Sequence, residues 1–419
     1  MKKLFFLIFL ILSFGIKITF AQDGCWEKKK NMSVARGVMP AVMLNDSIYV
    51  IGGSLDAYRS TSVVEVYDTA TDSWTPKANL PQKLCGETAG SVNNKIYVIG
   101  GSSSILGSGY VVDSVYEYNP VSNSWARKSN IPTPLAYAVA AVMVGKIYVI
   151  GGCPFGFNSA YKSVYEYNPA TDTWTRKSDM PTARFLASAT AVEGKIYVFG
   201  GMATLTGRGF SNVEVYDPSA DTWAVKGSMP VPRTTQSSSA VNGNIYIFSG
   251  GKMMGSVYND VLKYNPTLNT WETMTPIITP RVGNAACPLG GKIYVFGGMD
   301  ISNNRLSTVE EYDPVLDATN FVSVTNNNST IPRIFRLGQN YPNPFNPTTN
   351  IQYSIASRQF VELKIFNVLG QEIQTLVNAE KPAGNYQVEF NAANLPSGIY
   401  LYRIQAGSFN QVRKMILIK

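Results

Sequence analysis

The hydrophobic pattern of the chain is dominated by one short apolar segment that recurs six times. Residues 95–101 read KIYVIGG, and close relatives begin at residues 47, 146, 195, 244 and 292. In each copy β-branched and aromatic residues alternate, as they do in strands. The copies lie 48–51 residues apart, and a fixed period of this size predicts a propeller, a solenoid or an array.

Four predicted strands make up each unit. In the fourth unit a small-residue segment (184–192) precedes the repeated strand, and VEVYDP (213–218) and DTWAVKG (221–227) follow it. Asn-Pro or Asp-Pro after the third strand indicates a turn. The Gly pair lets the chain bend, because glycine adopts positive φ and permits close backbone approach. In NIYIFSGG we expect Ser249 to be an extra residue that forms a bulge.

The tryptophans indicate how the repeat closes. Five of the six follow a Gly pair within their own unit, whereas the sixth unit has none after EEYDP (310–314). The remaining tryptophan is Trp26, near the N-terminus. We therefore predict that the Trp26 strand completes the sixth unit, beside residues 308–313, and closes a ring. The first strand of each unit is rich in small residues, which fits the crowded axis of a propeller.

These features resemble the Kelch repeat. The matching elements are the IYV(I/F)GG strand, the Tyr-Asp/Asn-Pro turn, the regularly spaced Trp and blade starts that follow or approximate an MP-x-x-R segment. The resemblance covers residues 26–314. It implies an all-β fold, a six-bladed β-propeller whose N-terminal strand closes the last blade. Propellers include enzymes as well as binding modules, so the fold alone does not define the function.

Residues 1–21 are predicted to be a signal peptide. A positive MKK start is followed by an apolar run (4–16) and by small residues at Thr19 and Ala21, the usual order for a cleaved secretory signal. Thirteen apolar residues are too few to span a bilayer. We therefore expect an exported protein with no transmembrane segment.

The C-terminal part of the chain departs from the repeat. We assign residues 22–314 to the propeller, 315–333 to a linker rich in Asn, Ser and Thr, and 334–419 to a small Ig-like β-sandwich of about seven strands. The stretches YPNPFNPTT, LKIFNVLGQEI, LPSGIYLYRI and RKMILIK resemble the type A sorting domain of the bacterial type IX secretion system. This resemblance implies passage through the periplasm, recognition by an outer-membrane translocon and removal of the tail by a sortase. The propeller would then be secreted or displayed on the outer cell surface.

Charge and composition exclude several functions. The net charge is +8, but residues 22–333 carry 25 basic and 24 acidic side chains, so we expect no basic face and no nucleic-acid partner. The chain has no histidine, which excludes Ser-His-Asp and Cys-His catalysis and His-ligated metal sites. We expect no metal and no cofactor. The cysteines lack zinc-like spacing and are either disulfide-bonded or buried free thiols: Cys25, Cys85, Cys153 and Cys287.

One face of the propeller is expected to carry the sequence variation. The loops after the Gly pairs and the starts of the following blades lie on the same side, because strand direction alternates. Variable loops on a regular scaffold are the usual layout for binding. Six aromatic residues in these loops either offer flat faces to a sugar or peptide or pack inward: Tyr58, Tyr110, Phe155, Phe157, Phe210 and Tyr258.

Arginine recurs at the start of four contiguous blades, at Arg36, Arg184, Arg233 and Arg281. The guanidinium groups either bind carboxylates of a ligand or bond to neighbouring loop carbonyls as part of the repeat. Three residues after the arginine position, five of the blades have an uncharged residue and the second blade has an acid, Glu87. It either faces a wet channel or acts as a general acid/base.

Two functions are compatible with this sequence. The first is a surface-exposed propeller that binds a carbohydrate or a protein. The second is a carbohydrate-active enzyme resembling a sialic-acid mutarotase, with Arg184, Arg233 and Glu87 as candidate residues. Convergence of Glu87 with two or more arginines in one pocket would favour the enzyme, and arginines bonded within the scaffold would favour the binding module.

Overall fold

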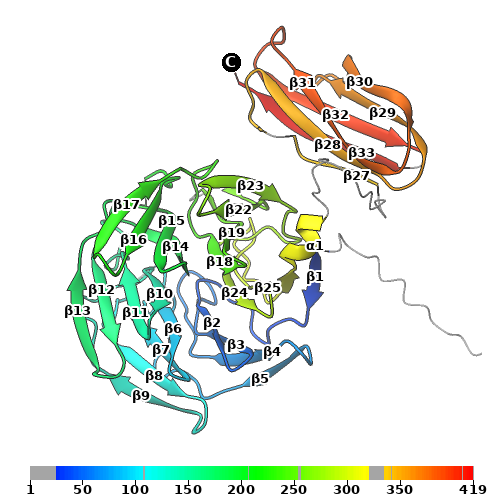
Figure 1. Ribbon diagram of the computed structural model, residues 1–419. Helices are drawn as coiled ribbons and strands as arrows, with labels where there is room; N and C mark the ends of the chain where they lie inside the picture. Colours follow the sequence, from blue (N-terminus) through cyan, green and yellow to red (C-terminus); the bar gives the residue numbers. More distant parts are fainter. Residues whose placement is uncertain are drawn as a thin grey trace, which may run out of the picture. The chain divides into compact units, whose positions relative to one another are not determined.

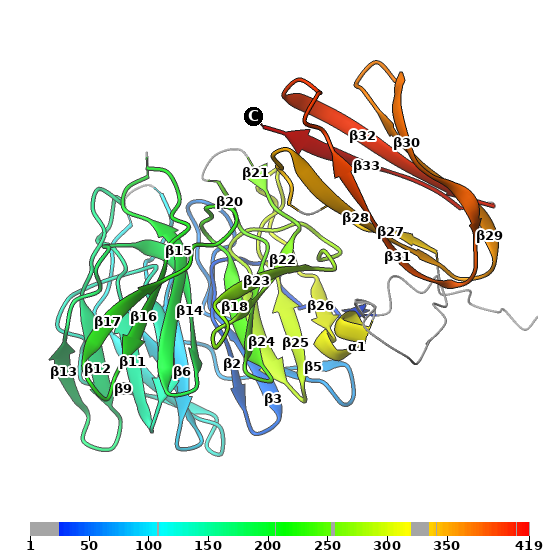
Figure 2. The ribbon, with the colours of Figure 1, turned by 45° about the horizontal axis from the view of Figure 1, so that its top comes forward.

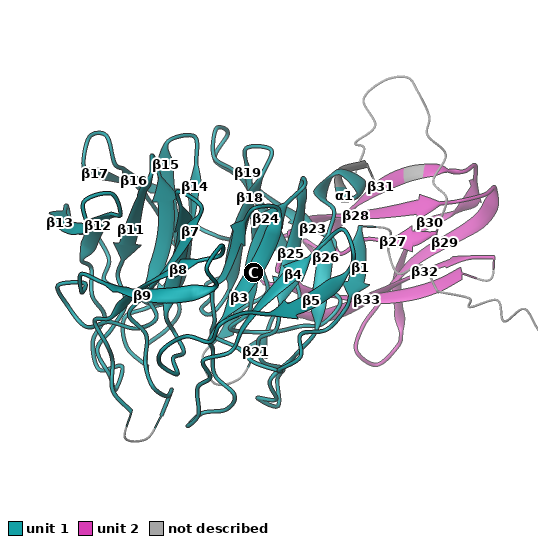
Figure 3. Cartoon of the chain, turned by 90° about the horizontal axis from the view of Figure 1, so that it is seen from below, with its two compact units in different colours: residues 1–317 teal, residues 318–419 magenta. Residues whose placement is uncertain are grey.

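A computed structural model describes most of the chain and divides it into two compact units, residues 1–317 and 318–419 (Figure 3). The described ranges are 25–106, 109–205, 207–252, 256–319, 335–340, 342–407 and 409–418. The predicted signal peptide and most of the predicted linker lie outside these ranges. No helix in the described part is long and apolar enough to cross a membrane.

Six four-stranded antiparallel sheets surround a central axis in the first unit (Figure 1). The first three blades contain β2 (Ala41–Leu44), β3 (Ser47–Ile51), β4 (Val64–Asp68), β5 (Ser73–Pro76); β6 (Thr88–Val92), β7 (Lys95–Ile99), β8 (Val115–Asn119), β9 (Ser124–Lys128); and β10 (Val139–Met143), β11 (Lys146–Ile150), β12 (Val164–Asn168), β13 (Thr173–Lys177). The fourth and fifth contain β14 (Phe185–Val192), β15 (Lys195–Met202), β16 (Val213–Asp217), β17 (Thr222–Lys226); and β18 (Ser237–Val241), β19 (Asn244–Phe248), β22 (Val261–Asn265), β23 (Thr270–Met274). The sixth contains β24 (Ala285–Leu289), β25 (Lys292–Phe296), β26 (Val309–Tyr312) and β1 (Trp26–Lys29).

The repeated apolar strand is buried on both faces because each blade packs between two others. Ile196, Tyr197, Val198 and Phe199 of β15 are all buried. Tyr197 and Phe199 share a hydrophobic cluster with residues of the next blade, among them Ile245. The alternation therefore distributes side chains between two interfaces rather than between core and solvent.

The ring closes as the sequence predicts. β1 pairs with β26, and Trp26 lies opposite Tyr312. The ring centroids of Trp26 and Tyr312 are 4.8 Å apart. The corresponding rings of Trp74 and Tyr67 in the first blade have centroids 5.0 Å apart. The indole N–H of Trp26 donates to the carbonyl of Thr275 in the fifth blade. The two ends of the propeller are thus held in one sheet.

A short helix replaces the outer hairpin of the sixth blade. α1 (Pro314–Thr319) begins directly after β26, in residues that composition alone assigns to a linker. Its Asp317 is buried, and accepts hydrogen bonds from the Tyr312 hydroxyl (2.6 Å) and the Thr275 amide. Asp72 has the same role in the first blade, where it accepts hydrogen bonds from the Tyr67 hydroxyl and from the backbone amide of Lys30. The helix therefore supplies the acid that a hairpin supplies elsewhere.

A closed ring of backbone hydrogen bonds joins all six blades near the axis. In each blade one residue with left-handed φ donates its amide to the equivalent carbonyl of the preceding blade; for example, Gly86 donates to Val38 and Val38 to Gly283. The ring members, with φ of 53–64°, are Val38, Gly86, Tyr137, Leu186, Thr235 and Gly283. Each blade is thereby fixed to both neighbours at the mouth of the channel.

The Gly pair is where one blade meets the start of the next. The Gly152 amide donates to the Arg184 carbonyl (2.9 Å), and a Cβ on Gly151 would lie 2.4 Å from that oxygen. The expectation of a bulge at Ser249 is wrong: Ser249 takes the place of the first glycine, at φ 55°, and β19 keeps a continuous register with β22. The additional glycine, Gly251, instead begins the hairpin of β20 (Gly251–Lys252) and β21 (Ser256–Val257), which lies on the upper side of the propeller in Figure 2.

The second unit is a β-sandwich. One sheet contains β27 (Arg336–Leu337), β28 (Thr348–Ile355) and β31 (Gly384–Asn391); the other, in the order β30-β29-β32-β33, contains β29 (Gln359–Phe366), β30 (Glu372–Lys381), β32 (Gly398–Ala406) and β33 (Phe409–Leu417). The inward residues of both sheets form one core, as the alternating pattern predicts. Phe345 covers part of the β33 edge by exchanging backbone hydrogen bonds with Ile416 and Ile418.

Candidate functional site

The four repeat arginines lie inside the propeller rather than on its loops. Arg281 is fully buried, and its Nη2 lies 2.5 Å from the Oε1 of Glu310. Its Nη1 donates to the carbonyls of Gly297 and Thr308, and its Nε to that of Thr279. Arg184 and Arg233 make equivalent ion pairs, and all four side chains are at most 1% exposed: Arg36–Glu65, Arg184–Glu214, Arg233–Asp260 and Arg281–Glu310.

Sequence reasoning missed the pairing rule behind these ion pairs. In three blades the acid stands two residues before the tyrosine of the third strand, at Glu65, Glu214 and Glu310. In the second blade Leu84 replaces the arginine and Tyr116 replaces the acid. In the third blade Leu135 and Tyr165 make the same replacements. In the fifth blade Arg233 is kept although the acid position holds Leu262, because Asp260 supplies the carboxylate. In the other five blades the two positions change together, and comparison of these repeats could have revealed the contact.

Arg36 is paired less completely than the other arginines. Only its Nη2 makes contacts, with Glu65 and with the Val50 carbonyl, while Nε and Nη1 have no partner among the described residues. Burial lowers the pKa of Arg36, and the carboxylates of Glu65 and Glu87 offset this effect. The first and second blades therefore enclose a guanidinium with unused donors.

Glu87 is a buried acid beside that guanidinium. Its side chain is buried, and no other side chain in the part of the chain that the structure describes is hydrogen-bonded to its carboxylate oxygens. Burial raises the pKa of Glu87 to about 8, and the charge of Arg36 opposes the rise. A Cβ on Gly52 would lie 2.0 Å from Oε1, so the glycine makes room for the carboxyl group. Glu87 is thus largely protonated at neutral pH.

Glu87 also lines the central cavity, which has a volume of about 210 Å³ and is formed by the inner strands of all six blades. The same repeat position holds Gln236 and Asn284 in the fifth and sixth blades. Their amide nitrogens donate to the Phe199 carbonyl and to the Ser237 hydroxyl, respectively. The four repeat arginines do not line this cavity. Glu87 and the two amides therefore line one cavity, whereas the four arginines lie outside it.

The loop aromatics divide into two groups. Tyr58 and Tyr110 are 67% and 56% exposed. Phe157 is buried against Tyr137 and Phe185, and Phe155 is half-buried. The remaining two are half-buried and cover the repeat arginines, Phe210 over Arg184 and Tyr258 over Arg233, each 5.2 Å from guanidinium carbon to ring centre.

The exposed tyrosines lie on two loops that hold each other in place. The Leu106 amide donates to the Ala57 carbonyl, and the Ser60 hydroxyl to the Ser103 carbonyl. The Gln82 amide donates to the Tyr110 hydroxyl. Leu106, next to these contacts, is itself exposed. The first two blades thus present a surface of Tyr58, Leu106 and Tyr110, which we term the blade 1–2 rim.

The repeat pattern does not single out Arg305, which lies in a loop of the sixth blade. It reaches from the sixth blade to the first, where its Nε donates to the Ser54 hydroxyl. Burial lowers its pKa, while Asp56, Cys85 and Tyr137 raise it. The four cysteines are buried and are not disulfide-bonded. No group of three or more Cys, Asp or Glu side chains in the described ranges could hold a metal ion.

Comparison with known families assigns this architecture. The family model of the attractin/LZTR1 β-propeller matches residues 19–257, and that of the Kelch motif matches residues 280–318. The chain belongs to the Kelch-type β-propellers. The model of the secretion system C-terminal sorting domain matches residues 339–419 of this Kelch protein. It therefore combines a Kelch propeller with a type IX sorting domain, which directs the chain to the cell surface or to secretion.

The curated relatives match only parts of their own length. Kelch-like protein 25 of Xenopus tropicalis is 30% identical over 146 residues, which cover 33% of this chain and 24% of that protein. Beta-scruin of Limulus polyphemus is 27% identical over 130 residues, covering 30% of this chain and 14% of that protein. The solved structure of YjhT superposes with a TM-score of 0.59 at 18% identity, over 67% of this chain and 95% of that one. At this identity the likeness shows the fold alone.

Proposed function

We propose that this Kelch propeller is an exported, non-enzymatic module that binds a carbohydrate or a protein on the blade 1–2 rim. The observation that carries the proposal is the separation of the two groups of side chains: Tyr58 and Tyr110 are exposed on mutually supported loops, whereas the repeat arginines are buried with their own acids. Aromatic side chains are frequent anchors in binding surfaces because they bury a large area at a small entropic cost.

The neighbouring polar groups give the rim its hydrogen-bonding capacity. Arg59 is exposed, and its Nε lies 2.6 Å from Asp56, which also accepts the amides of Tyr58 and Arg59. This fixes the turn that carries Tyr58. A ligand would therefore meet a preorganised loop, which reduces the entropic cost of binding.

The sorting domain serves delivery in this proposal. The exported chain crosses the periplasm, and a translocon in the outer membrane recognises residues 334–419. A cell-surface sortase then removes this domain, and the propeller is released or attached at the surface. The match of the sorting-domain family to residues 339–419 supports this route.

The test is binding of the purified exported chain to a glycan array and to surface proteins of its own host. We expect the double variant Tyr58→Ala/Tyr110→Ala to lose at least about tenfold in affinity, because aromatic anchors carry much of the binding energy, at an unchanged melting temperature. The control is Val121→Ala/Leu268→Ala, which truncates two apolar residues in the outer turns that are at least as exposed as the two tyrosines. Equal binding by both double variants would contradict the proposal.

The alternative is a carbohydrate-active enzyme, and one observation favours it: the pKa of Glu87, near 8 in a central cavity, suits a general acid/base. Against it, Arg184 and Arg233 are committed to Glu214 and Asp260 and do not line that cavity. Anomer interconversion of N-acetylneuraminic acid, followed by NMR with the wild type and Glu87→Gln, distinguishes the two. Catalysis that disappears in Glu87→Gln would replace the binding proposal.

A further inference from the structure

A second, larger hollow lies between the third and fourth blades. It has a volume of about 600 Å³, which is within the range of small-molecule sites. Its walls come mainly from the turns that join the first to the second strand and the third to the fourth strand. Because successive strands are antiparallel, these turns lie on the face opposite to the loop rim. We call this hollow the blade 3–4 groove; its lining includes Met143, Val144, Glu193, Lys195, Asp217 and Ser219.

The two turns that border the groove are the two that depart from the repeat. All six turns between the first and second strands begin with a residue at positive φ or with glycine, which is usual for tight hairpins. Four of them begin with the favoured types, Asn45, Asn93, Asn242 and Gly290. The other two begin with Val144 and Glu193, and both of these residues line the groove.

Val144 is unfavourable for folding at this position. Its φ is 49° and its side chain is 91% exposed. A β-branched residue in the left-handed region is a true outlier, and strained residues of this kind cluster at functional sites. Since the side chain is also almost fully exposed, burial does not offset the strain. The fold therefore gives no reason for a valine at this position.

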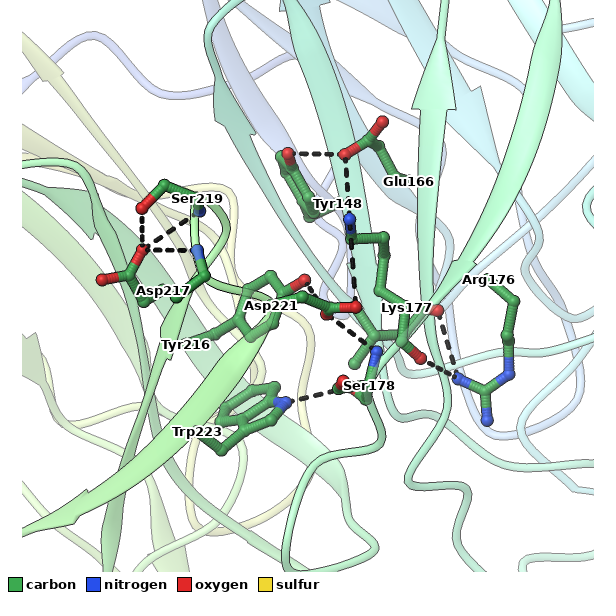
Figure 4. Close-up of polar contacts among 12 residues, drawn as sticks. Tyr148, Glu166, Arg176, Lys177, Ser178, Tyr216, Asp217, Ser219, Asp221 and Trp223 are labelled. Atoms are coloured by element: carbon green, nitrogen blue, oxygen red, sulfur yellow. Dashed lines mark hydrogen bonds and ion pairs between the residues drawn. The ribbon is translucent and has the colours of Figure 1, made fainter.

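The floor of the groove alternates positive and negative groups. Glu166 is buried, and its carboxylate receives Lys146 (2.5 Å) and the Tyr148 hydroxyl (2.7 Å). The Lys177 ammonium lies 4.0 Å from Glu166 and 4.0 Å from Asp221, beyond hydrogen-bond distance from either (Figure 4). Its donors are therefore not used by these two carboxylates.

The fourth blade continues the same alternation. The Lys195 ammonium lies 2.7 Å from Asp217. Asp217 also accepts hydrogen bonds from the hydroxyl and the amide of Ser219 (Figure 4). Glu193 is exposed at the edge. Three ammonium groups and three carboxylates line the groove, so its formal charge is zero: Lys146, Lys177, Lys195, Glu166, Glu193 and Asp217.

We propose that the blade 3–4 groove binds a neutral oligosaccharide. A strongly charged ligand would meet like charges on either side. A sugar hydroxyl both donates and accepts, so vicinal hydroxyls can bond to a carboxylate and an ammonium that stand next to each other. Val144, Met143 and Pro218 provide apolar surface for the C–H faces of the rings. This site is separate from the blade 1–2 rim, and neither depends on the other.

The test uses the turn residues of the sister blades. The variant Val144→Asn/Glu193→Asn restores the residue type of Asn45, Asn93 and Asn242, and should leave the melting temperature unchanged or higher. We expect the full exported chain to bind at least one of maltotriose, cellotriose, laminaritriose and mannotriose in isothermal titration calorimetry, and the double variant to bind it at least tenfold more weakly. Lys177→Gln should weaken binding as well.

Three results would overturn the assignment. The first is that the wild type binds none of the four trisaccharides. The second is that Val144→Asn/Glu193→Asn binds as tightly as the wild type. The third is that Tyr58→Ala/Tyr110→Ala is the only double variant that loses binding. The last result would support the rim as the glycan site, so failure of the groove and failure of the rim give different outcomes.

Discussion

Buried charge is the feature that most distinguishes single residues in this propeller. A buried ion pair loses most of its Coulombic gain to desolvation, so it is weak evidence for stability. The chain contains its own comparison, because two blades replace the Arg–Glu pair by Leu84 with Tyr116 and Leu135 with Tyr165. Both solutions support the same blade geometry. The Arg–Glu pair is therefore one of two ways to fill these positions, and the blade geometry does not require it.

Glu87 should make the stability of the propeller depend on pH. Burial raises its pKa from 4.5 to about 8, so the folded state holds a proton that the unfolded state has released. Between these two pKa values the free energy of unfolding should therefore fall as pH rises, by about 1.4 kcal/mol per pH unit at most. Urea unfolding of the wild type and Glu87→Gln at pH 5, 6.5 and 8 measures the effect.

The substitution should remove most of the decline between pH 5 and 8. The absence of histidine leaves few other groups that titrate in this interval. Parallel pH profiles for the two proteins would mean that Glu87 has an ordinary pKa in the folded state.

At the scale of elements, two segments far apart in sequence complete the sixth blade. β1 gives it an outer strand and a tryptophan, and α1 gives it the acid that bonds to Tyr312. Both elements bond to Thr275 of the fifth blade. Trp26 donates to the Thr275 carbonyl, and Asp317 accepts from the Thr275 amide. Ring closure therefore depends on an N-terminal strand and on a C-terminal helix.

A chain that begins at residue 34 should not form a stable propeller. It lacks the β1 ladder with β26 and the buried Trp26 ring, a loss of several kcal/mol, since removing a buried Trp alone costs about 3–5 kcal/mol. We expect it to aggregate or to melt at a much lower temperature in circular dichroism. A peptide of residues 22–33 added in trans should restore part of the stability, and an unchanged melting temperature without it would exclude a closing role for β1.

At the scale of the whole molecule, two compact units carry separate tasks. Each has its own hydrophobic core, and the sandwich core draws on both of its sheets. The sorting-domain family covers residues 339–419, while the Kelch matches end at residue 318. Folding of the propeller should therefore not require the sorting domain.

Deletion of residues 335–419 in the native host should leave the propeller folded but retained in the periplasm. The reason is that the translocon then has no signal to recognise, although the propeller core is intact. Cell fractionation with immunodetection measures the location, and the melting temperature of the purified shorter chain controls for folding. Surface delivery of the shorter chain would refute the sorting role.

The sequence by itself determined the repeat, the number of blades, the displaced strand and the sorting domain. These follow from local periodicity and from one missing tryptophan, signals that a strand pattern and a fixed repeat length preserve. It did not reveal α1, because the Asn- and Ser-rich composition after residue 320 obscured Asp317, five residues after Tyr312. It also misplaced Ser249, because the second glycine of SGG belongs to the next hairpin.

The tertiary structure alone decided where the chemistry lies. The sequence leaves open whether Arg36 and Arg281 face a ligand or the scaffold, and only the folded blades show that they are buried with Glu65 and Glu310. The groove lined by Val144 and Glu193 joins turns that are 49 residues apart in sequence. Such sites depend on which residues adjacent blades bring together. Local periodicity does not reveal contacts between residues that are so far apart in sequence.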